Sequence, residues 1–238
     1  MHIRVGLLLI FFALSMPSAQ AQKFSKFLKK TTKALFEEDG DIGLGLKQAL
    51  EFGVNQAVEE LSAEDGYFDS QYKVLIPEEA RKVISKLKHV PGFENVERDL
   101  IAKMNEAAEY AAREATPIFV SAITSMTFDD ALQILSGEQD AATRYLERST
   151  RDQLYESFMP VIQDALDEVN AREFWATAVN TYNQIPFVKR VNPELDDHVN
   201  NAALNGLFGE IEKKEVGIRS NQDERTTELL RSVFSQQD

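Results

Sequence analysis

Cysteine is absent from the 238 residues of the chain. Without thiols the protein can form no disulfide framework, and neither cysteine catalysis nor thiolate metal binding is possible. A lipid anchor attached to a cysteine behind a signal cleavage site is excluded for the same reason. Stability must therefore come from the packing of side chains.

Motifs for metals, nucleotides and activated serines are also lacking. Beyond residue 21 the histidines are His89 and His198, and neither belongs to a His-x-x-x-His or Glu-x-x-His pattern. Glu194 lies one turn from His198, but acids at this point are typical of a helix start. The chain has no Gly-x-Ser-x-Gly turn, and Gly43-Leu44-Gly45 is not followed by the third glycine of a nucleotide loop. We expect no cofactor and no metal site.

Positive charge is scarce. Lysine and arginine total 26 against 39 aspartates and glutamates, which gives a formal net charge of −13. An acidic surface repels phosphate backbones, so nucleic acid is not an expected partner.

A single long apolar run is present, from Val5 to Met16 behind Arg4. Ala19-Gln20-Ala21 follows it with the small residues that signal peptidase requires. The run is too short to cross a bilayer and no other approaches its length, so we expect no transmembrane span. Residues 1–21 are predicted to be a signal peptide, and the protein is predicted to be periplasmic or secreted in a bacterium.

Residues 22–41 form a basic leader followed by an acidic turn. In the leader, the apolar side chains of Phe24, Phe27 and Leu28 share one helical stripe and lysines occupy the rest. This pattern is typical of a short helix on an anionic membrane surface, or of a leader whose aromatics pack on the domain. Residues 22–35 are thus a candidate peripheral membrane contact, with these candidate residues: Lys23, Phe24, Lys26, Phe27 and Lys30.

From residue 42 to residue 238 the apolar positions recur at helical spacing. The pattern predicts one compact multi-helix bundle of the all-α class, with a core built on the faces that carry Leu46, Leu100 and Leu207. No pair of strands is expected, although residues 72–76 suggest a short extended piece. The predicted helices cover residues 42–62, 77–89, 96–115, 140–148, 150–170, 171–185, 195–215 and 223–234. Pro117 marks a kink or a new helix start, and a further helix is capped by Thr127 and ended by Gly137 in a left-handed conformation.

Three long segments resemble a known bacterial family. They are MNEAAEYAAREATPIF at 104–119, MTFDDALQILSGEQDAATRYLERST at 126–150 and ALNGLFGEIEKKEVGIRSNQDERTTELLRSVF at 203–234, and GLKQALEFGVNQAVEELSAEDGYF at 45–68 agrees with them. Together they resemble the family DUF4197 over residues 42–234, with departures at His198 and Gln222. The resemblance implies an exported helical protein, and it transfers no functional residue because the family has no established activity.

Two polar groups are candidate ligand sites. Asp129 and Asp130 are predicted to cap a helix, and the alternative is that Asp130, Asp140 and Thr143 meet in a polar pocket. Arg219 and Arg225, near the predicted N-cap at Ser220-Asn221, are predicted to hold an anion or to pair with acids such as Glu212 and Glu215. The aromatic residues Phe174, Trp175 and Tyr182 are interpreted as core residues rather than as a ligand lining.

No reactive constellation emerges from these residues. The leading hypothesis is a non-catalytic binding or interaction module of the bacterial envelope, whose partner is an envelope protein or a small ligand. One alternative is a hydrolase or lyase whose acids and arginines converge only in the fold. A second alternative is a membrane-surface protein attached through its leader, and the oligomeric state stays open.

Overall fold

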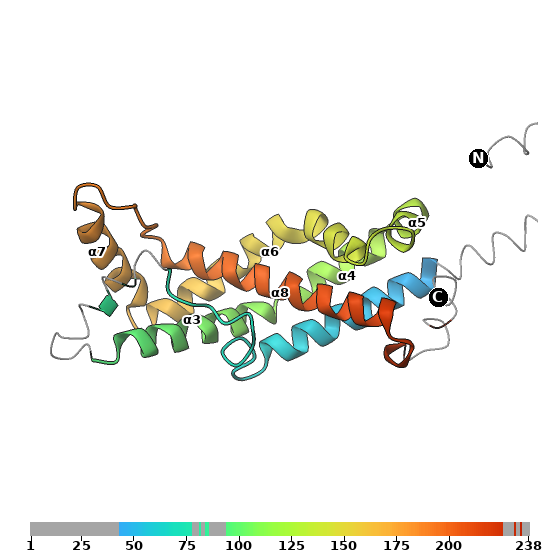
Figure 1. Cartoon of the computed structure of the whole chain (residues 1–238), viewed down its shortest axis with the longest axis horizontal. Coiled ribbons are helices and arrows are strands. Elements are labelled where there is room, and N and C mark those ends of the chain that lie inside the picture. Colours follow the sequence, from blue (N-terminus) through green and yellow to red (C-terminus); the bar gives the residue numbers. More distant parts are fainter. Residues whose placement is uncertain are drawn as a thin grey trace, which may run out of the picture. The chain divides into compact units, whose positions relative to one another are not determined.

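Helices make up nearly all regular structure in the part of the chain that a computed structural model describes, which is residues 43–77 and 94–225 with positions 81, 84, 85, 231 and 234. The chain divides into two units, Met1–Leu44 and Gly45–Asp238, and the helices labelled α3 to α8 in Figure 1 belong to the second. The predicted signal peptide and the leader candidates from Lys23 to Lys30 lie outside the described residues, as does most of the helix predicted over 77–89.

The first described helix covers residues 43–62. It is followed by α3 (Val96–Ala112), α4 (Ala115–Ser125), α5 (Phe128–Leu135), α6 (Ala141–Asp167), α7 (Ala171–Asn183), α8 (Leu195–Ser220) and the short 3-10 helix η3 (Gln222–Glu224). No strand occurs over 43–77 or 94–225, so the predicted all-α helical bundle is confirmed.

The long helices α6 and α8 form the centre of the bundle, and α3 packs against both (Figure 1). Half of the buried residues of α3 are alanines, and Ala107, Ala108 and Ala111 are fully buried. Because these side chains are small, neighbouring helices can approach closely. The predicted core faces are also confirmed, since Leu46, Leu100 and Leu207 are all buried.

Two predicted helices are in fact one. α6 runs unbroken for 27 residues, through the predicted break at Ser149 and past Pro160. The hydroxyls of Ser149 and Thr150 donate to the carbonyls of Tyr145 and Leu146, each four residues back, so both polar groups are satisfied inside the helix. The helix predicted over 195–215 likewise continues to Ser220.

The predicted left-handed stop at Gly137 is wrong. Its φ lies outside the left-handed range, and the reason for glycine here is space. A Cβ at this position would lie 2.7 Å from the Cβ of Ala141 and 2.8 Å from the carbonyl oxygen of Gln133. Glycine therefore permits the close turn between α5 and α6.

The predicted extended piece over 72–76 is irregular backbone held by a side chain. The amide of Asn105, on α3, accepts from Val74 N at 2.8 Å and donates to Val74 O at 3.0 Å. This buried amide thus makes the pair of bonds that a neighbouring strand would otherwise supply.

No single helix among the described residues is long and apolar enough to cross a membrane. The pair α4 and α5 has the required composition, but its two helices meet at a bend of 103°.

Candidate functional site

The candidate residues at the end of α8 form a buried network around Glu215. One oxygen of Glu215 accepts from Ala142 N at 2.9 Å, and the other accepts from Thr143 N and Thr143 Oγ1 at 2.8 Å each. A carboxylate at the start of a helix satisfies N–H groups that have no partner within the helix, and it faces the positive end of the helix dipole. Glu215 therefore caps α6 from α8.

Arg219 holds a third helix to the same carboxylate. Its Nε donates to Glu215 Oε1 at 2.9 Å, and a terminal nitrogen donates to the carbonyl of Ile134 at 2.8 Å, near the end of α5. The pairing of Arg219 with Glu215 is thus confirmed. One ion pair ties together the end of α5, the start of α6 and the last turns of α8.

Arg225 is almost completely buried beneath the end of α8. Its guanidinium donates to the carbonyls of Ile218 and Arg219 at 3.0 and 2.9 Å. A cation at this end of a helix meets the negative end of the dipole. Both arginines also lie 5.8 Å from the ring centre of Phe234, so an aromatic face covers the pair.

Asp130 has the capping role that the sequence predicts. Its carboxylate accepts from Thr127 N at 3.0 Å, and its own N–H donates to Thr127 Oγ1 at 3.2 Å, which completes a capping box at the start of α5. Hydrogen bonds from the hydroxyl and backbone of Thr127 lower the pKa of Asp130.

Asp140 lies in the N-cap position of α6 but makes no capping bond. It accepts from Arg144 at 2.6 Å instead. Asp130 and Asp140 line the same surface depression of about 240 Å³, whereas Thr143 is buried against Glu215 and does not line it. The predicted meeting of all three residues in one pocket is therefore wrong, because the hydroxyl of Thr143 is used inside the bundle.

The described residues contain no group of three or more acids or histidines placed to hold a metal ion. His198 contacts the carbonyl of Leu75 through Nε2 at 2.8 Å, which ties α8 to the irregular segment.

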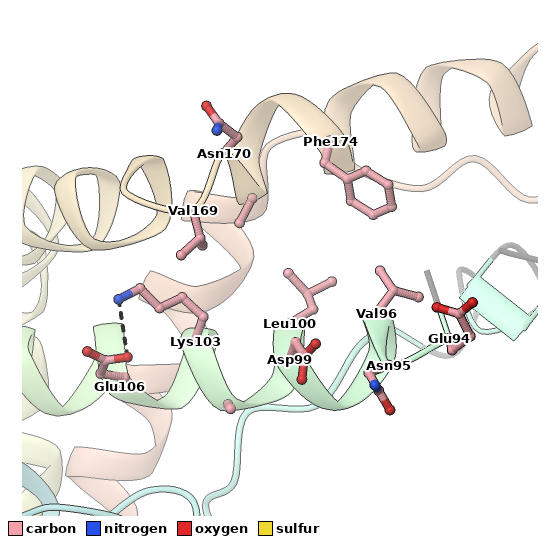
Figure 2. Close-up of a pocket in the computed structure, with 12 residues that line it drawn as sticks. Glu94, Asn95, Val96, Asp99, Leu100, Lys103, Glu106, Val169, Asn170 and Phe174 are labelled. Atoms are coloured by element: carbon pink, nitrogen blue, oxygen red, sulfur yellow. Dashed lines mark hydrogen bonds and ion pairs between the residues drawn. The ribbon is translucent and has the colours of Figure 1, made fainter. Parts of the chain in front are cut away.

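A groove of about 680 Å³ lies between α3 and the start of α7 and is here called the α3–α7 groove. Figure 2 shows Val169 and Phe174 on one wall, facing Val96 and Leu100 on the other. Val169 is 55% exposed, so apolar surface is open to solvent here. Phe174 is half-buried and lines this groove, which corrects its assignment as a core residue, whereas Trp175 is buried as predicted.

An ion-pair cluster closes one end of this groove. Lys103 contacts Glu106 and Glu168 at 3.2 Å each, and so joins α3 to the residue after α6. Burial opposes the charge of Lys103, but its hydrogen bonds to the two glutamates raise the pKa of Lys103. Burial opposes the charge of Glu106 too, and hydrogen bonds from Tyr110 and Lys103 lower its pKa nonetheless. Both groups are charged at neutral pH.

The family model described as "Protein of unknown function (DUF4197)" matches residues 37–235. The chain belongs to this DUF4197 family. No curated protein and no solved structure is significantly similar to it.

In this DUF4197 protein, sequence reasoning missed the groove residues Val169 and Asn170. A signal for them existed, because asparagine tolerates positive φ and Asn170 has φ 52° at the sharp junction of α6 and α7. The chain changes direction at that junction (Figure 1), and Val169, which lies in it, is exposed.

Proposed function

We propose that this DUF4197 protein is a non-catalytic binding module of the bacterial envelope, exported by residues 1–21. In this proposal the α3–α7 groove binds a small ligand that combines an apolar body with a cationic group. One observation carries the proposal: the groove leaves apolar side chains open to solvent while most ionisable candidates are bonded within the bundle.

The size and lining of the groove support a small ligand. Its volume of about 680 Å³ falls within the range of known ligand pockets, which is roughly 300–1,000 Å³. Val96, Leu100, Ala171 and Phe174 supply apolar contact. An apolar body placed between them would lose contact with water on two sides.

The charge of the lining supports a cation. Glu94, Asp99 and Glu106 face the groove with Lys103 as the single cationic side chain in the lining, and Asp99 is paired at 3.0 Å with Arg98 outside the lining. Lys103 is already neutralised by Glu106 and Glu168, so it offers little attraction to an anion. The net charge of −13 acts in the same direction, since it draws cations toward the surface.

Titration calorimetry with octylammonium and octanoate tests this proposal, because the two probes share an apolar chain and differ in charge. We expect octylammonium to bind and octanoate to bind at least tenfold more weakly. Val169→Trp fills the groove and should abolish binding, whereas Leu132→Trp, at an exposed position of α5, should leave it unchanged. Equal binding of the two probes, or binding that survives Val169→Trp, would contradict the proposal.

The enzyme hypothesis has a separate test. A panel of ester, phosphate and peptide substrates should show no turnover that depends on Asp130 or Arg225. Turnover lost in Asp130→Asn, whose side chain can still accept from Thr127, would overturn the non-catalytic assignment.

A further inference from the structure

The loop between α7 and α8 has an unusual composition for this chain. No acid occurs between Glu173 and Glu194, although aspartate and glutamate number 39 among 238 residues. The cations of this stretch, Lys189 and Arg190, follow the apolar run Ile185-Pro186-Phe187-Val188. The loop is thus a basic and apolar exception on an acidic protein.

The apolar residues of the loop point into solvent. Phe187 is fully exposed, at 107% of its reference area, and Ile185 is 50% exposed. Pro186, Lys189 and Arg190 are exposed as well. The three exposed residues Ile185, Pro186 and Phe187 are consecutive and form one apolar patch, and a contiguous patch of this kind indicates a surface that something covers.

The base of the loop is firmly held. The amide of Asn183 donates to Val191 O at 2.8 Å and accepts from Val191 N at 2.9 Å, which joins the two ends of the loop. The buried Trp175 donates to Asn192 O at 3.0 Å and fixes the loop to α7. In Figure 1 the loop connects the far end of α7 to the start of α8, at one end of the bundle.

The backbone also turns the tip outward. Phe187 has φ 66°, a conformation that bulky L-residues rarely adopt. Since the loop is closed at its base, this conformation holds the ring away from the core instead of letting it fold back.

We propose that the loop of residues 184–190 inserts its apolar tip, Ile185-Pro186-Phe187, into the surface of an anionic phospholipid bilayer, while Lys189 and Arg190 contact the headgroups. The aromatic residue can enter the apolar region beneath the headgroups, and the neighbouring cations can contact the anionic headgroups above it. A protein partner of comparable affinity would need about 800 Å² of interface on each side, more than one short loop provides. This site is independent of the basic leader and of the α3–α7 groove.

The absence of cysteine permits a direct test on the full chain. A nitroxide is attached to Ile185→Cys and, as the matched control, to Leu132→Cys, which is 43% exposed on α5. With vesicles of phosphatidylglycerol and phosphatidylcholine, we expect the label at position 185 to become accessible to oxygen and protected from a water-soluble nickel reagent. The label at position 132 should stay in water.

Vesicle sedimentation gives the second measurement. Phe187→Ser should weaken binding about tenfold, because one buried phenylalanine supplies at least that factor. Lys189→Ser with Arg190→Ser should weaken it about tenfold at low salt and have little effect at high salt. Phe128→Ser, and Arg98→Ser with Arg148→Ser, remove exposed groups of the same kind elsewhere and should change nothing.

A label at position 185 that stays in water in the presence of vesicles would overturn the proposal, whatever the leader contributes. Protection of the label by lipid-free envelope proteins alone would overturn it too, and would identify the loop as a protein-docking site. Octylammonium binding measured on Phe187→Ser separates the groove proposal from the loop proposal. The substitution changes only the loop, so octylammonium should bind to the variant as it binds to the unchanged protein.

Discussion

At the scale of single residues, the groups that look reactive in the sequence are mostly occupied by structural bonds. Glu215 accepts from residues 72 and 73 positions away and from Arg219 one turn away. The near partner could be predicted from the sequence, since side chains four apart on a helix are neighbours. The distant partners could not, because nothing local indicates which helix start will meet α8.

Removal of Glu215 therefore has a predictable cost. Glu215→Ala leaves the start of α6 and the buried Arg219 without their carboxylate, and we expect the free energy of unfolding to fall by about 3 kcal/mol. The matched control is Glu212→Ala, an exposed acid on the same helix, which should cost little. Equal losses in urea unfolding of the two variants would contradict the capping role.

Glu109 makes stability depend on pH. Burial raises the pKa of Glu109, although its carboxylate accepts backbone N–H groups from Tyr67 and Phe68. The folded state therefore favours the protonated form of Glu109. The contribution of Glu109 to the free energy of unfolding is complete below the unfolded pKa of 4.5 and is lost as the pH rises through the folded pKa.

Glu109→Gln should consequently raise the melting temperature at pH 7 and change it much less near pH 4. Glutamine keeps an oxygen for Tyr67 N and needs no ionisation in the buried site. Exposed Glu59→Gln controls for the loss of one charge. The same gain for Glu109→Gln at both pH values would refute this account.

At the scale of elements, Gly206 on α8 admits the loop that follows the helix over 43–62. A Cβ on Gly206 would lie 2.8 Å from the ring of Tyr67 and 2.9 Å from the Cβ of Tyr72. Tyr67 is fully buried and its hydroxyl donates to the carbonyl of Ala203 at 2.8 Å. The close approach of loop and helix thus depends on the missing side chain.

Two glycine substitutions should have opposite effects. Gly206→Ala should destabilise the protein by about 1–3 kcal/mol, because the fixed ring of Tyr67 cannot move aside. Gly53→Ala, in the helix over 43–62, would meet the Cβ of Lys214 at 3.7 Å and the Cδ1 of Ile218 at 4.0 Å, both ordinary contacts, and should stabilise the protein by about 0.5–1 kcal/mol. Thermal unfolding measures both, and a destabilising Gly53→Ala would argue against this packing.

At the scale of the whole molecule, the proposed export has a simple test. The apolar run from Val5 to Met16 and the small residues Ala19 and Ala21 after it favour a protein that leaves the cytosol. Protein recovered from the cell envelope should have the intact mass of residues 22–238. Recovery of the uncut chain from the cytosol would contradict the proposed location in the bacterial envelope.

The apolar spacing of the sequence by itself determined the helical class, the core faces of Leu46, Leu100 and Leu207, and the cap at Thr127, because helix periodicity and capping are local properties. The tertiary structure alone decided that α6 is continuous, that Thr143 bonds Glu215, and that Val169 and Phe174 face a groove. These outcomes depend on which distant helices meet. An apolar period of three to four residues indicates which side of a helix is buried. It does not indicate which other helix that side packs against.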